Sequence, residues 1–207
     1  MSTTRRSTEH HRAARSTAFV AGRTRWCLVT RTDGTYPVAA RRPIASWGCA
    51  SASRPVLDLG HAERVWPQAR QAFLSQSVDP RFEQICRDWA LLADDVLGEP
   101  PAEVGSGVVA DPANKTQIEL DVAVFAATSP GERRRVLSLG EVKWGRTMGI
   151  RDLRRLERAR ELLAQHGFDT AAARLACYSG SGFDDQLREA AANSTEVLLV
   201  DPDRLYG

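Results

Sequence analysis

The sequence predicts an α/β fold in which a mixed sheet is flanked by helices. Apolar residues recur at helical spacing before residue 100, and strand-like segments separated by turns follow that point. Hydrophobic residues make up 43% of the 207-residue chain and charged residues 26%, which is typical of globular domains. From residue 79 on, the predicted order is helix, three strands, helix, strand, helix, strand. An antiparallel meander followed by a helical crossover to a parallel strand is the simplest packing of that order.

The chain is predicted to divide near residue 53. Residues 1–53 hold nine arginines against Glu9 and Asp33, and their apolar residues follow no clear period. We expect only a short strand within 25–31 and interpret 1–53 as a poorly defined extension, either a remnant or a disordered segment. Residues 54–207 are predicted to form the α/β domain.

Two helices are predicted to precede the sheet. The first lies within 61–74, with Pro67 in its first turn. The second begins at Asp79 as N-cap and Pro80 as N1, and it ends at Gly98.

The strands and the later helices follow in order. We expect a hairpin of strands 105–111 and 116–127 around the turn 112–115, and a third strand over 135–145. A helix over 150–166, with Gly167 as C′ residue, crosses to a strand over 172–180. A capping box from Ser181 to Asp184 opens the next helix, and the strand 196–202 closes the domain.

A carboxylate and an ammonium lie two residues apart on the third strand. Side chains alternate along a strand, so Glu141 and Lys143 are predicted to share one face, opposite Val142 and Trp144. On the preceding strand the same rule separates Asp121 from four apolar residues. If the two strands pair, Asp121 converges with Glu141 and Lys143. The apolar set is Ile118, Leu120, Val122 and Val124.

These three residues suit metal-dependent phosphodiester hydrolysis. Two neighbouring carboxylates repel unless a cation lies between them, and oxygen ligands suit Mg²⁺ or Mn²⁺. Lys143 would then stabilise charge that develops on the phosphate. The chain has only one other lysine, Lys115, and otherwise uses arginine. The alternative is a structural ion pair between Glu141 and Lys143 on a half-exposed sheet.

Together the segments FEQICRDW, IELDVAVF, LGEVKWG and MGIRDLRRL resemble the PD-(D/E)XK nuclease superfamily. Residues 54–207 resemble more closely the domain of unknown function 234, which lies at the C-terminus of archaeal-type ATPases of prokaryotes. The resemblance implies a restriction-endonuclease-like α-β-β-β-α-β core with Asp121 and Glu141 as metal-binding acids and Lys143 as catalytic lysine. It also implies Glu83 as the acid on the first helix, whose alternative role is a favourable charge near a helix N-terminus.

Partners follow from the same resemblance. No G-x-x-x-x-G-K-[ST] loop occurs, so we expect a family member that lacks its ATPase part. Such a chain would be a truncated or frame-disrupted product. An ATPase partner could then come from another chain. The free cysteines and the lack of a signal sequence or apolar span predict a cytoplasmic protein without membrane contact.

Nucleic acid is the expected substrate, because ten basic and only three acidic residues lie between Arg133 and Arg160. The alternative function is a non-catalytic module that binds nucleic acid or protein on a nuclease-like fold. The alternative role of an individual arginine is an ion pair along the helix, such as Arg154 with Glu157. DNA or RNA, strandedness and oligomeric state are left open by the sequence. The predicted phosphate contacts are Arg151, Arg154, Arg155 and Arg158.

Overall fold

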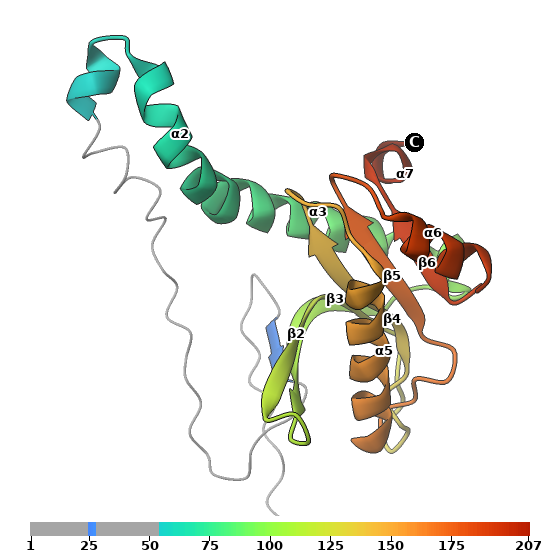
Figure 1. The fold of residues 1–207 in the computed structure, drawn as a ribbon. Helices are drawn as coiled ribbons and strands as arrows, with labels where there is room; N and C mark the ends of the chain where they lie inside the picture. Colours follow the sequence, from blue (N-terminus) through green and yellow to red (C-terminus); the bar gives the residue numbers. More distant parts are fainter. Residues whose placement is uncertain (1–24, 28–53) are drawn as a thin grey trace, which may run out of the picture.

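The protein is built on one twisted mixed sheet. The structure, a computed structural model, describes residues 25–27 and 54–207. Its six strands lie in chain order across the sheet (Figure 1). The pairs β2–β3 and β3–β4 are antiparallel, and the pairs β1–β2, β4–β5 and β5–β6 are parallel. The strands are β1 (Arg25–Cys27), β2 (Glu103–Asp111), β3 (Thr116–Phe125), β4 (Val136–Lys143), β5 (Arg174–Ser179) and β6 (Val197–Val200).

The predicted α/β class and order of elements are confirmed. The second predicted helix, 79–98, is divided into α3 and the short helix α4, and the short helix α7 after β6 was not expected from the sequence. The short strand predicted within 25–31 is present as β1. The helices are α2 (Ala62–Phe73), the π-helical turn η1 (Leu74–Val78), α3 (Asp79–Leu91), α4 (Asp94–Leu97), α5 (Ile150–Gln165), α6 (Asp185–Ala192) and α7 (Pro202–Tyr206).

Helices cover both faces of the sheet and define two apolar layers. On one face, Leu153 and Leu156 of α5 and Leu187 of α6 pack against strand residues such as Leu139. On the other face, α3 and α7 pack against a second set of strand residues, which includes Val142 and Tyr178. The sheet is therefore covered on both sides in its centre, along the second half of β3, β4 and β5.

The predicted turns are confirmed in two places. Residues 112–115 connect β2 to β3, and Lys115 adopts a left-handed φ of 51° in this turn. Gly167 follows His166, the C-cap of α5, with φ 87°, a conformation that costs glycine little.

Three predicted helix starts were wrong. The helices α2, η1 and α3 form one continuous rod, so Val78 precedes α3 in helical conformation and Asp79 is not an N-cap. Pro67 lies inside α2 and not in its first turn. The cap of α6 is Asp184, whose carboxylate accepts a hydrogen bond from Leu187 N at 2.8 Å, so the box predicted from Ser181 is absent. Asp79 and Pro80 have the residue types of a helix start, and nothing in these two residues indicates that the helix continues into them through a π turn.

The predicted alternation on β3 was also wrong. Gly105 and Gly107 of β2 pair with Ala123 and Leu120 of β3, so β3 carries one extra residue at Asp121 and Val122. This β-bulge reverses the side chains beyond it. Ile118 and Leu120 belong to the α5 layer, whereas Val122 and Val124 belong to the α3 layer.

An ion pair between the half-buried Arg158 and the buried Asp111 ties the β2–β3 hairpin to α5. Arg158 Nε and Nη2 each lie 3.0 Å from one carboxylate oxygen of Asp111, and Asn114 Nδ2 donates to Asp111 Oδ2 at 2.8 Å. Hydrogen bonds from Arg158 and Asn114 hold the pKa of Asp111 well below its usual range. The pair fixes the hairpin end against the crossover helix.

The Asp111 carboxylate should make the fold acid-sensitive. A carboxyl whose pKa is lower in the folded than in the unfolded chain stabilises the fold above the unfolded pKa of about 4 and loses that contribution as pH falls further. We expect Asp111→Asn to lower the denaturation midpoint at pH 7 and to flatten its decline below pH 4. Urea titrations from pH 7 to pH 3 measure both effects, with the exposed Asp95→Asn as control. An unchanged acid profile would contradict the prediction.

None of the helices in the described ranges is both long and apolar enough to span a membrane.

Candidate functional site

The predicted pair on β4 faces the crossover helix. Lys143 Nζ lies 2.7 Å from Glu141 Oε1, so the two side chains share a face as predicted. Val142 and Trp144 project into the opposite layer, where the Trp144 ring meets Phe82 of α3 edge-on at 5.0 Å. Alternation is therefore regular from Leu139 to Trp144, beyond the register shift that pairs Val124 with Ser138 and Phe125 with Val136.

Asp121 joins this pair because of the β3 bulge. Its Oδ2 accepts a hydrogen bond from Val142 N at 2.8 Å, just beyond the last β3–β4 pairing of Val122 with Gly140. The same oxygen lies 3.8 Å from Lys143 Nζ. Burial raises the pKa of Asp121 to about 6, against the lowering effects of the Val142 N–H and of Lys143. The convergence of Asp121, Glu141 and Lys143 expected from strand pairing is thus present.

Glu141 is the most enclosed acid of the site. It is 1% exposed, and its Oε1 also accepts a hydrogen bond from Arg155 Nη1 of α5 at 3.1 Å. Its Oε2 is buried without any hydrogen-bond partner. A buried carboxylate oxygen without a partner carries a desolvation cost, so its retention requires a reason.

The four predicted phosphate contacts on α5 divide into two groups. Arg155 reaches inward to Glu141, and Arg158 pairs with Asp111. Arg151 and Arg154 are exposed, and neither forms an ion pair with any residue in 54–207. The alternative pair of Arg154 with Glu157 does not form among residues 54–207, and Arg160 lies 2.7 Å from Glu196.

Glu83 lies on α3, which covers the face of the sheet opposite α5. Its carboxylate is 3.5 Å from Arg87 Nη1, and burial raises its pKa. Because α3 continues from η1 without a free N-terminus, the helix-end alternative for Glu83 no longer applies. Within the described ranges no three His, Cys, Asp or Glu side chains group closely enough to hold a metal together. A ligand role for Glu83 stays a prediction.

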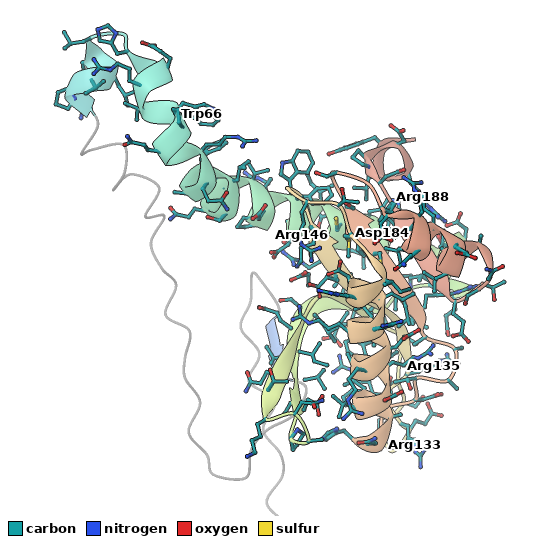
Figure 2. All side chains as sticks on the ribbon, in the orientation of Figure 1. Trp66, Arg133, Arg135, Arg146, Asp184 and Arg188 are labelled. Carbon is teal, nitrogen blue, oxygen red and sulfur yellow. The ribbon has the colours of Figure 1, made fainter. Side chains whose placement is uncertain are left out.

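Two supporting arginines were missed by the sequence analysis. Arg87 Nη1 donates to the backbone oxygen of Asp121 at 2.9 Å, which links α3 to the bulge. Arg146 binds both oxygens of Asp152 at 3.0 and 2.6 Å, and Asp152 also accepts from Gly149 N, so this pair fixes the start of α5 (Figure 2). Neither contact leaves a sequence signal, because each joins residues whose proximity depends on the tertiary fold.

The donor set suits a hard divalent cation. Mg²⁺ binds through one or two carboxylates and takes its remaining ligands from water and substrate phosphates. Asp121 and Glu141 supply two carboxylates close to the same ammonium, and the unpartnered Glu141 Oε2 is a free oxygen ligand. These residues therefore fit Mg²⁺ or Mn²⁺, although no third acid completes the set in the described part of the chain.

Comparisons with known proteins assign no family. The chain matches no protein-family model and no curated protein. Among solved structures it is similar to a crystal structure of a protein of unknown function, AF1548, at 14% sequence identity and a TM-score of 0.32. The match covers 58% of this chain and 57% of that one, a little over half of each.

Proposed function

We propose that the chain is a Mg²⁺- or Mn²⁺-dependent nuclease of the PD-(D/E)XK type, with Asp121 and Glu141 as metal ligands and Lys143 as catalytic lysine. The observation that carries the proposal is the buried, unpartnered Glu141 Oε2 beside Asp121 and Lys143. A sheet that served only structure would gain by replacing such a group, since buried charge is costly. In this proposal Glu83 is an additional acid on the α3 side.

The chemistry divides between the cation and the side chains. Bound Mg²⁺ polarises a phosphate oxygen and lowers the pKa of a coordinated water. The Val142 N–H orients Asp121, and Arg155 orients Glu141. Lys143 holds a compact positive charge between the two carboxylates, from which it can donate a hydrogen bond to a phosphate oxygen as negative charge develops.

The decisive experiment is cleavage of labelled single- and double-stranded DNA and RNA by the purified protein. We expect cutting that requires Mg²⁺ or Mn²⁺, and loss of at least ~100-fold in Asp121→Asn, because a charged ligand is lost while the Val142 N–H bond can be kept. Mn²⁺ should raise the melting temperature of the wild type and not that of Asp121→Asn.

The control for this experiment is Asp95→Asn, an exposed carboxylate on α4. It should cut normally and keep the thermal shift. A folded wild type that shows neither cutting nor a metal-dependent thermal shift would overturn the proposal.

The exposed arginines of α5 are the proposed phosphate contacts. Arg151 and Arg154 have no ion-pair partner in the described ranges, so their charges are available to a polyanion. Replacing both with glutamine is expected to weaken binding uniformly across sequences and to lower the salt dependence of log K by about 2. Fluorescence anisotropy from 50 to 300 mM salt measures this. Arg133→Gln, before the opposite end of β4, is the control and should leave the slope unchanged (Figure 2).

A second candidate function is a non-catalytic module that binds nucleic acid or an ATPase partner supplied by another chain. The observation in its favour is that Glu141 Oε1 is already bound by two cations, Lys143 and Arg155. Such a module would bind nucleic acid without cutting, and Asp121→Asn would not alter its binding.

A further inference from the structure

The projecting helix α2 carries an apolar face that the rest of the described chain does not cover. Trp66 is 47% and Phe73 46% exposed, and no residue of α2 is buried. The helix stands away from the sheet at the end of the α3 rod, with Trp66 on this distant part (Figures 1 and 2). The helix continues through η1 into α3, which packs on the sheet, but the apolar face of α2 itself stays exposed, and an exposed apolar patch is typical of an interaction surface. This face therefore calls for a partner.

The apolar residues of α2 have the spacing of a two-helix seam. Ala62, Trp66, Ala69 and Phe73 follow one another at intervals of four, three and four, which places them on one stripe. The rings of Trp66 and Phe73 are in contact along this stripe, 5.6 Å apart between centroids. The alternation of large and small side chains leaves room for the large residues of a facing helix.

The charges beside this stripe are self-complementary. Glu63 and Arg70 are seven residues apart and each directly follows a stripe residue, so both lie on the same flank. In an antiparallel pair the same flanks of the two helices face each other. A two-fold axis at Trp66 and Pro67 then places Glu63 opposite Arg70 of the partner subunit, and the reciprocal pair follows by symmetry. A parallel pair would not match these two charges.

We infer that α2 is a homodimerisation helix, and that two copies of the chain pair antiparallel through its Trp66 face. Both charged residues are available: Arg70 is exposed without an ion pair in the described ranges, and Glu63 meets only the exposed His61, at 3.4 Å. Twelve residues separate the axis at Pro67 from Asp79, about 18 Å of helix. The two sheets therefore lie at opposite ends of the pair and do not obstruct it.

The inference is tested by the molecular mass of the full chain in solution, from light scattering and sedimentation over a concentration series. The wild type is expected to have the mass of two chains. Glu63→Arg and Arg70→Glu should each raise the dimer dissociation constant about 10-fold or more, since each loses two symmetric pairs and creates like-charge contacts. The double variant exchanges the charges and should return to within about 3-fold of the wild type.

The control is Arg64→Glu, which makes the same charge change on the side of α2 away from the stripe. It should leave the dissociation constant unchanged, and circular dichroism should show equal helix content in all variants. A wild type that is monomeric at every concentration would overturn the inference, because the Trp66 face would then be covered by its own chain or left exposed. A dimer that neither charge reversal weakens, or that the double variant fails to restore, would overturn it as well.

Discussion

Lys143→Met should abolish cleavage while metal binding persists. The ammonium lies 2.7 Å from Glu141 Oε1 and 3.8 Å from Asp121 Oδ2. Its removal takes away the charge proposed to stabilise the transition state, and loss of one such donor typically costs about 10²- to 10³-fold in rate. Both carboxyl groups remain, and the ammonium no longer repels the cation, so Mn²⁺ should bind at least as tightly as in the wild type. Single-turnover cleavage and the Mn²⁺-induced melting shift measure the two effects.

The chain offers a matched control for this substitution. Lys115 is the only other lysine and lies in the exposed turn between β2 and β3. Lys115→Met should leave both cleavage and the melting shift unchanged. Lys143→Arg should recover little activity, because a planar guanidinium cannot replace a compact ammonium between two carboxylates. A Lys143→Met protein that cuts at the wild-type rate would show that Lys143 only balances the buried charge of Glu141.

The pattern of β4 could be predicted because it is local. Strand alternation alone placed Glu141 and Lys143 on one face and Val142 on the other, and the structure agrees. On β3 the same rule failed, because the sequence around Asp121 carries no mark of the extra residue that makes the bulge. The convergence of Asp121 with the β4 pair was nevertheless expected correctly, because β3 and β4 are neighbours and the bulge leaves Asp121 within reach of Lys143.

The ion-pair partners of the arginines on α5 could not be predicted from the sequence. All four arginines named on α5 were expected as phosphate contacts, but Arg155 and Arg158 turn toward buried acids from β4 and β2. Which arginine meets a buried carboxylate depends on how α5 sits over the sheet, and a long side chain can reach either inward or outward. Sequence periodicity specifies the face of a helix and not the partner of each charge on it.

A side chain at Gly140 should destabilise the fold and impair the site together. An added Cβ there would lie 2.7 Å from the ring of Tyr178 and 3.0 Å from Val122 Cβ, closer than packed atoms allow. Tyr178 is 1% exposed and its ring meets Trp89 edge-on, so it has little room to move. The strand must therefore shift, and Glu141 is the next residue along it.

Gly140→Ala is accordingly expected to cost about 1–3 kcal/mol of unfolding free energy, a loss of roughly 2–10 °C in melting temperature. The matched control is Gly145→Ala, just beyond the same strand, where a Cβ meets no atom within 4 Å. The control should melt within about 0.5 kcal/mol of the wild type. In the proposed nuclease, cleavage by Gly140→Ala should fall even well below its melting temperature, because a small displacement of Glu141 misplaces a metal ligand. Equal stability of the two variants would mean that the Tyr178 ring moves to make room for the new methyl group. The close packing at Gly140 would then not fix the position of Glu141.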